Sequence, residues 1–181
     1  MNKRVLSLTL LLACLGLMTM QAEGRKVESF NSGWSFKKAP VEKELALNAP
    51  KWESGWSEVE IPHTWNAKDM QVQANNFYEG AAYYKKNYFF PADLKGKRVF
   101  LRFEGVGSCT EVFVNGMLAT SHKGGYSAFA CEISPLLKVG EENEIIVKAD
   151  NKSRPDVIPV NHNLFGVYGG IYRPVWLIVT E

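Results

Sequence analysis

The sequence lacks a surplus of charge of either sign. Its 181 residues include 21 basic and 19 acidic side chains, which leaves a net charge of +2, and the basic residues form no stripe. Because proteins that bind nucleic acid concentrate Lys and Arg on one face, this class of function has no electrostatic support. The length suffices for one domain with its own core.

Catalytic and metal-binding motifs are also missing. The three histidines, His63, His122 and His162, have no metal-ligand spacing. Residues Gly105–Ser108 lack the helix and the Gly-Lys-Ser/Thr ending of a phosphate loop, and no Gly-x-Ser-x-Gly elbow occurs. Many acidic residues lie in polar, loop-like runs. The residues alone therefore predict no catalytic machinery, no metal site and no cofactor.

Long apolar runs are absent except near the start. Residues Val5–Met18 are apolar but too short to span a bilayer comfortably, and they follow a positively charged start. Small or polar residues come next, so the layout predicts a secretory signal peptide over residues 1–24, with cleavage after Ala22 or Gly24. We therefore expect an exported protein, periplasmic or extracellular, without a membrane span.

An alternative for the same segment is a bacterial lipoprotein box. Leu11–Cys14 resembles such a box, which would anchor the protein to lipid through Cys14. The apolar run continues past Cys14, whereas a lipoprotein box usually ends it. The pattern favours export without an anchor.

Cysteine is scarce. Once Cys14 is removed, Cys109 and Cys131 remain. Export permits a disulfide between them. The alternative is that both cysteines are free and packed as small apolar side chains. Neither has a histidine placed to activate it for catalysis.

Aromatic side chains, by contrast, are plentiful, with five Trp and seven Tyr. Sugar rings stack on aromatic planes, which would fit sugar binding. Large β-sandwiches also bury many aromatics in their cores, and this second interpretation is the simpler one.

The chain after residue 24 has the pattern of short strands separated by turns, with little helical periodicity. We predict strands at residues 30–36, 58–61, 82–90, 98–104, 111–114, 117–119, 127–133, 144–149 and 171–179. Asn115-Gly116 between two apolar runs predicts a tight hairpin, and Ser134-Pro135 predicts a helical turn capped by Ser134. This pattern predicts an all-β fold, an antiparallel β-sandwich of the jelly-roll type.

One long loop interrupts this pattern, at residues 150–168, and loops of this length are more often functional than idle. Gly169-Gly170 lets the chain turn sharply out of the loop. Arg173 is expected to pair with a carboxylate or with carbonyl groups. Pro174 lacks an N–H, so it predicts a sheet edge or a bulge at this point.

Five segments resemble, in order, the motifs of the sugar-binding domain of glycoside hydrolase family 2. They are Ile61–Asn66 (like "LPHTWN"), Tyr78–Lys86, Phe103–Gly116 (like "FEGV…VWVNG"), His122–Phe129 (like "H-GGY-F") and Gly169–Leu177 (like "GGIYRDVWL", with Pro174 where Asp is common). The matches run in the family's order from about Trp34 to Leu177, nearly the whole chain after residue 24. The resemblance implies a galactose-binding-domain-like jelly roll over residues 25–181.

The resemblance also implies a larger enzyme. Members of the family include β-galactosidases, β-glucuronidases and β-mannosidases, in which an immunoglobulin-like domain and a (β/α)₈ barrel with two catalytic glutamates follow. A barrel takes about 250 residues, more than this chain holds, so the chain is predicted to be inactive alone. The implied partners are those two domains and a β-linked glycoside or oligosaccharide.

In the family, an acidic or amide residue shortly before "GGIYR" contacts the sugar. The matching segment here holds Asn161, His162 and Asn163, whose side chains can donate and accept hydrogen bonds. The Asp often found there is absent, and the nearest one is Asp156. The alternative is that these residues only brace the loop.

Other residues of the motifs are expected to be structural. His63 and Trp65 would lock the loop after a strand, and Tyr126 and Phe129 would belong to the sandwich core. Glu104 and Arg173 would form a buried ion pair.

Three functions from different classes follow. The first is the non-catalytic N-terminal domain of an exported β-galactosidase-like glycosidase in carbohydrate metabolism. The second is a free-standing carbohydrate-binding module or lectin, and the third is an interaction module without a ligand. The order of the motifs favours the first.

Overall fold

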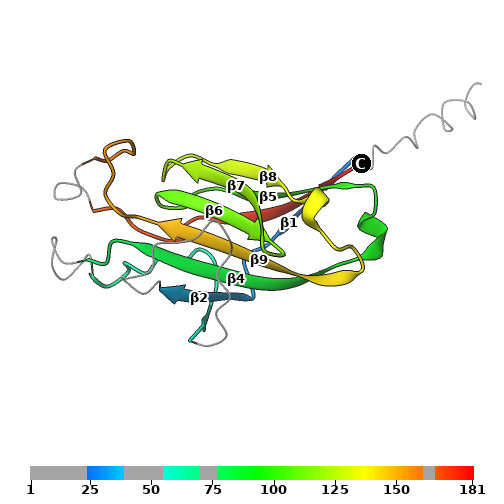
Figure 1. The fold of residues 1–181 in the computed structure, drawn as a ribbon, viewed down its shortest axis with the longest axis horizontal. Helices are drawn as coiled ribbons and strands as arrows, with labels where there is room; N and C mark the ends of the chain where they lie inside the picture. Colours follow the sequence, from blue (N-terminus) through cyan, green and yellow to red (C-terminus); the bar gives the residue numbers. More distant parts are fainter. Residues whose placement is uncertain (1–23, 39–54, 70–76, 161–165) are drawn as a thin grey trace, which may run out of the picture.

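The computed structural model describes residues 24–38, 55–69, 77–160 and 166–181, which form two antiparallel sheets packed face to face (Figure 1). The strands are β1 (Arg25–Ser29), β2 (Trp34–Lys38), β3 (Ser57–Val59), β4 (Ala81–Phe90), β5 (Arg98–Phe103), β6 (Cys109–Val114), β7 (Met117–Lys123), β8 (Phe129–Glu132), β9 (Glu141–Asp150) and β10 (Val175–Thr180). Two short 3₁₀ turns, η1 (Ala92–Leu94) and η2 (Ser134–Leu136), connect strands.

The strand order confirms the predicted jelly roll. The smaller sheet has the order β1-β10-β5-β8, and the larger sheet has the order β3-β2-β4-β9-β6-β7. Without β2 and β3, the two sheets have four strands each, in the arrangement of a double Greek key. The strands β2 and β3 widen the larger sheet beside β4.

The core lies between the sheets and follows the two-residue period of the strands. On β5, Val99, Leu101 and Phe103 are buried, as their alternation in the sequence predicts. On the larger sheet, Val112 and Val147 belong to the same core cluster. A fully buried side chain of this kind stabilises the fold by about 1.5–3 kcal/mol, so the sandwich rests mainly on this layer.

The hairpin between β6 and β7 confirms the Asn-Gly prediction. Asn115 has φ 51° and Gly116 has φ 81°, which are the positive values that a type I′ turn needs. The predicted role of Ser134 is wrong, because its side chain makes no capping bond at η2. Its Oγ instead accepts a hydrogen bond from the Val99 amide at 2.7 Å and ties η2 to β5.

The two largest errors in the predicted starts of strands are at residues 30 and 171, and strand β1 was not predicted. Residues 30–36 are not one strand, because a turn ending at Gly33, with φ 73°, separates β1 from β2. The last strand starts at Val175 rather than residue 171, so Pro174 lies just before it. Because β10 lies between β1 and β5, the predicted edge position is also wrong. Pro174 interrupts no ladder hydrogen bond because it precedes the strand.

Both cysteines in the described residues are free. Cys131 on β8 belongs to the core between the sheets, whereas Cys109 starts β6 in the other sheet. The structure therefore answers the question that the sequence left open, and burial raises the pKa of the Cys131 thiol to about 12.

Three further expectations concern the segments around β5 and β8. Glu104 and Arg173 do not form the expected buried ion pair, because Glu104 binds Arg102 at 2.9 Å on the surface. The Arg173 guanidinium instead donates to the Tyr126 carbonyl at 3.4 Å. Tyr126 is 57% exposed, so its placement in the core was wrong, whereas Phe129 packs against the core as predicted.

Candidate functional site

The candidate sugar-contacting residues Asn161, His162 and Asn163 lie outside the described residues. The structure does describe both ends of the loop that carries them, up to Val160 and from Gly166 onward. The residues at these ends lie at one end of the sandwich, far along its long axis from the C-terminus (Figure 1). The site is therefore built from the base of this loop.

Two buried asparagines join the ends of the loop. The Asn151 amide nitrogen Nδ2 donates to the Val167 carbonyl at 2.9 Å and to Asn66 Oδ1 at 3.2 Å. Asn66 Oδ1 also accepts a hydrogen bond from the Gly169 amide at 2.8 Å. Both asparagines are completely buried. We call Asn66 and Asn151 the asparagine pair.

The remaining polar atoms of the asparagine pair bind the segment before β4. Asn66 Nδ2 donates to the Tyr78 carbonyl at 3.1 Å and to the Asp69 carboxylate at 3.1 and 3.2 Å. The Asp69 carboxylate accepts from the Tyr78 amide at 3.0 Å, and Asn151 Oδ1 accepts from the Gly80 amide at 2.9 Å. Since the donors and acceptors of both amides are used, four separate segments are held in one arrangement.

The two glycines after the loop are needed for close approach to the core. A Cβ atom on Gly169 would lie 1.9 Å from Trp65 Cζ2, so the indole ring occupies the space of a side chain. Gly170 has φ 113°, and a Cβ there would lie 2.5 Å from the Tyr84 hydroxyl. The sequence predicted the sharp turn, and the structure adds the reason for two consecutive glycines.

His63 and Trp65 have structural roles, as expected, and they also contact the segment that follows the long loop. His63 Nδ1 is 2.8 Å from the Tyr84 hydroxyl, and the His63 amide donates to the Ile171 carbonyl at 2.8 Å. Burial lowers the pKa of His63, so the imidazole is neutral at pH 7. Its ring also packs against Phe36, with centroids 4.7 Å apart.

Ion pairs brace the first part of the loop. The Asp150 carboxylate accepts from the Lys152 amide and from the Arg154 guanidinium, each at 2.8 Å. Asp156 pairs with Lys123 of β7 at 2.5 Å, and this hydrogen bond lowers the pKa of the Asp156 carboxyl. Asp156, the nearest aspartate to the predicted site, is thus already bound to a lysine in the structure.

Several large apolar side chains are exposed at the same end of the molecule. A shallow groove of about 330 Å³ lies between residues 123–127 and 156–158. Tyr126 and Ile158 line it, and Tyr168 is exposed beyond the loop. The loop end therefore combines rigid backbone, paired charges and exposed apolar surface, which suits contact with a ligand or another domain.

Within the parts of the chain that the structure covers, no three His, Cys, Asp or Glu side chains come together as a metal site would require. The same residues include no helix with the length and apolar character needed to cross a bilayer.

Reasoning from the sequence missed the asparagine pair as a unit. Asn66 lies in a motif that the sequence singled out, but no local pattern marks Asn151 or Asp69. Their partners are distant in the chain, so their role follows only from the packing.

The fold defines the class of protein: a jelly-roll β-sandwich domain with a long loop whose two ends are braced by buried hydrogen bonds. Residues 27–181 match the model described as "Glycosyl hydrolases family 2, sugar binding domain". The chain therefore belongs to glycoside hydrolase family 2, which confirms the resemblance of its motifs.

Similar proteins carry related names. A β-glucuronidase of Bacteroides fragilis is 43% identical over 123 residues, which are 68% of this chain and 18% of that protein. A β-galactosidase of Thermoanaerobacter pseudethanolicus is 34% identical over 160 residues, covering 87% of this chain and 21% of that protein. Such relatives are much longer, and the chain spans about a fifth of their length.

Solved structures agree with the fold. A Bacteroides fragilis protein provisionally named a β-galactosidase superposes with a TM-score of 0.80 and 68% identity, over 87% of this chain and 24% of that one. A β-glucuronidase of Bacteroides uniformis superposes with a TM-score of 0.73 and 30% identity, over 86% of this chain and 18% of that one.

Proposed function

We propose that the chain is the non-catalytic N-terminal sugar-binding and scaffold domain of an exported, β-galactosidase-like β-glycosidase that acts in carbohydrate metabolism. The match to the family's sugar binding domain supports this function, as do relatives named β-glucuronidase and β-galactosidase. In this proposal the catalytic glutamates belong to a barrel domain outside the 181 residues, and this chain contributes no catalytic residue.

The contribution to the sugar site comes from the loop between Asn151 and Val167, and its contacts are Asn161, His162 and Asn163. The observation that supports this assignment is the asparagine pair, which fixes both ends of the loop to the sandwich. A loop with fixed ends loses less conformational entropy when it binds, so more of its contact energy appears as affinity.

The proposed partners are the immunoglobulin-like and barrel domains of the longer hydrolase, together with a β-linked glycoside. The exposed side chains at the loop end, Tyr126, Ile158 and Tyr168, suit contact with the barrel, because a sugar site shared by two domains requires them to meet beside the loop. No cofactor is required for this role.

The first experiment measures the native product and its activity. Immunoblotting of source cells with an antibody against this domain should detect a protein several times larger than this chain. The purified longer protein should hydrolyse a chromogenic β-galactoside or β-glucuronide, and residues 25–181 alone should not. Turnover by the short chain, above a mock preparation, would contradict the proposal.

Substitutions in the longer protein test the site itself. His162→Ala and Asn163→Ala should each lower kcat/KM by about 5–30-fold, since each variant loses roughly one hydrogen bond to the sugar. Lys152→Ala is the matched control, because Lys152 is an exposed residue of the same loop. Equal effects in all three variants would show that the loop matters only for folding.

Export is tested on the mature protein. Cleavage after Ala22 or Gly24 predicts a periplasmic or extracellular product that begins at Glu23 or Arg25, and its intact mass identifies which. A product that starts at a lipid-modified Cys14 would replace this part of the proposal with a membrane-anchored form.

A free-standing carbohydrate-binding module is the second candidate, and the exposed rings of Tyr126 and Tyr168 favour it. Exposed rings can stack on sugars without help from another domain. Calorimetry separates the two functions: as a scaffold domain, residues 25–181 should bind β-glycosides only at about millimolar concentration or more weakly. Micromolar binding would support the lectin-like function.

A further inference from the structure

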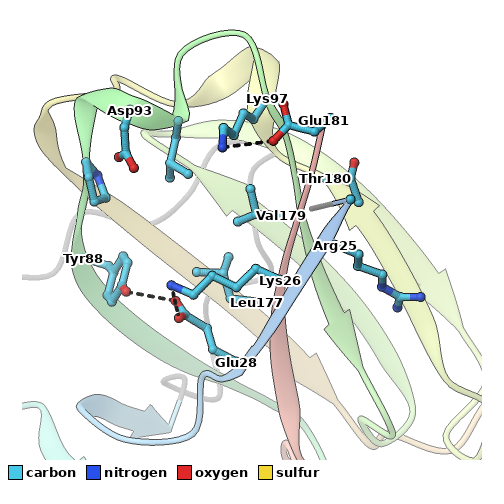
Figure 2. Close-up of a pocket in the computed structure, with 13 residues that line it drawn as sticks. Arg25, Lys26, Glu28, Tyr88, Asp93, Lys97, Leu177, Val179, Thr180 and Glu181 are labelled. Carbon is cyan, nitrogen blue, oxygen red and sulfur yellow. Dashed lines mark hydrogen bonds and ion pairs between the residues drawn. The ribbon is translucent and has the colours of Figure 1, made fainter. Parts of the chain in front are cut away.

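A second groove lies at the opposite end of the sandwich from the loop. It runs between β1 and β10 on one side and the end of β4 with η1 on the other, with a cavity volume of about 510 Å³. Figure 2 shows Tyr88, Leu177 and Val179 along its inner part. Asp93 lies on the side of the groove opposite Thr180. The groove is therefore an opening between the two sheets at the end where β10 finishes.

The rim of this groove carries charged side chains that form weak ion pairs with one another. Lys26 pairs with Glu28 at 2.8 Å, and Lys97 pairs with Glu181 at 3.1 Å. Lys26 and Glu181 are mostly exposed, and exposed ion pairs of this kind contribute little to stability because solvent screens them. Their side chains can change partners at little cost. An apolar floor with a polar rim is also the usual anatomy of a protein–protein interface.

The direction of the chain indicates what would cover this groove. The strand β10 ends at Thr180, and both Thr180 and Glu181 line the groove. A polypeptide that continues beyond residue 181 must therefore start at the groove. Two relatives of this chain are nearly four times as long, because 68% of this chain covers only 18% of one of them and 87% covers only 24% of the other.

We propose that this groove is the docking surface for the domain that follows residue 181 in the longer hydrolase. The inference rests on the proposed function, which requires such a domain. It adds a second interface to the one at the loop end, so that the sandwich is held at both ends of its long axis. Contacts between domains of one chain typically bury about 600–1,500 Å², and the groove would form the recessed part of such an interface.

Thiol labelling tests the groove directly. Asp93→Cys places a thiol in the groove, and Ser121→Cys on β7 is the matched control at an exposed position away from it. Both are made with Cys109→Ser, so that the partly exposed native thiol does not react. Each labelled peptide is quantified by mass spectrometry, in residues 25–181 expressed alone, which are the mature chain of the proposal, and in the longer protein.

The expected result is labelling of Asp93→Cys that is about tenfold or more slower in the longer protein, with about the same rate at Ser121→Cys in both. Equal rates at Asp93→Cys in the two proteins would overturn the groove assignment. Similar slowing at both positions would also overturn it, because the partner would then cover the sandwich generally.

Charge reversal gives an independent measurement. Lys97→Glu should lower the melting temperature of the mature chain by no more than about 4 °C, as for any exposed pair. In the longer protein, it should lower the melting temperature of the unit that contains this domain by a clearly larger amount. An equal effect in both proteins would count against docking at this rim.

Failure of this inference is distinguishable from failure of the proposed function. A large, active native product whose groove thiol reacts freely would remove the docking surface and leave the function intact. A single native product of the size of this chain would remove both.

Discussion

Replacing Asn151 with alanine tests the central feature of the candidate site. The Asn151 side chain donates to the Val167 carbonyl and to Asn66, and it accepts from the Gly80 amide. Alanine leaves these partners, and the Tyr78 carbonyl that also accepts from Asn151 at 3.3 Å, without Asn151 in a place where the side chain is completely buried. A buried polar group that loses its partner costs about 1–3 kcal/mol. Since water and small shifts can satisfy part of the loss, we expect a total of about 3–5 kcal/mol.

The assay is urea unfolding of the mature chain, followed by tryptophan fluorescence. With a slope of about 2 kcal/mol per molar urea, the expected loss moves the midpoint down by about 1.5–2.5 M. A domain of this size has a total stability of about 5–15 kcal/mol, so the variant should remain folded but be markedly weaker. Hydrogen exchange should also speed up at the amides of Gly80 and Gly169.

Two further variants make the test specific. Asn87→Ala is the matched control, because Asn87 is exposed on β4, and its effect should stay within about 0.5 kcal/mol. Asn151→Asp places a carboxylate against the acceptors of Val167 and Asn66, which raises the pKa of the new group. Its stability should therefore fall as pH rises through that raised pKa. A loss below about 1 kcal/mol in Asn151→Ala would refute the claim that the asparagine pair holds the loop base.

Three other outcomes follow from the same structure. Gly169→Ala should lower the free energy of unfolding by about 1–3 kcal/mol because the Trp65 indole, which occupies the space of the new methyl group, must move. Gly125→Ala should be nearly neutral, because the nearest neighbours of its new Cβ would lie at 3.6 Å. Thermal melts check both variants. Burial lowers the pKa of His63 in the folded chain, so stability should fall as pH drops below about 6.5, the unfolded value. Unfolding at pH 5–7 should show this slope in the native chain and lose it in His63→Gln. In the folded mature chain, Cys109 should react with a thiol reagent and Cys131 should not, because Cys131 is buried and burial raises its pKa to about 12. Equal reactivity of the two thiols would place Cys131 outside the core.

The strands were predictable where their signal is local. Alternation of apolar and charged side chains identified β5, and Asn115-Gly116 identified the hairpin between β6 and β7, because strand faces and turn angles depend on adjacent residues. The boundary errors at residues 30–36 and 171–179 have the opposite cause. There the apolar residues fill space between segments rather than lining one face of a strand, so the period of the sequence is misleading.

The candidate site was predictable only in part. His63 and Trp65 were expected to lock the loop after a strand, and in the structure they also contact the segment that follows the 150–168 loop. The partner segment around Asn151 was not anticipated, since Asn66 and Asn151 are 85 residues apart and no local pattern links them. The expected pairing of Glu104 with Arg173 failed for a different reason: Arg102 lies two residues before Glu104 on the same face and binds it at 2.9 Å.

The sequence by itself determined the fold class, the hairpin and the family, because these depend on side-chain period, turn geometry and ordered motifs that are written along the chain. Only the tertiary structure decided that the cysteines stay apart, that Tyr126 faces solvent, and that two asparagines close the base of the loop. Each of these depends on which distant segments the packing of two sheets brings together. Such contacts arise because buried polar atoms must find partners wherever the fold supplies them.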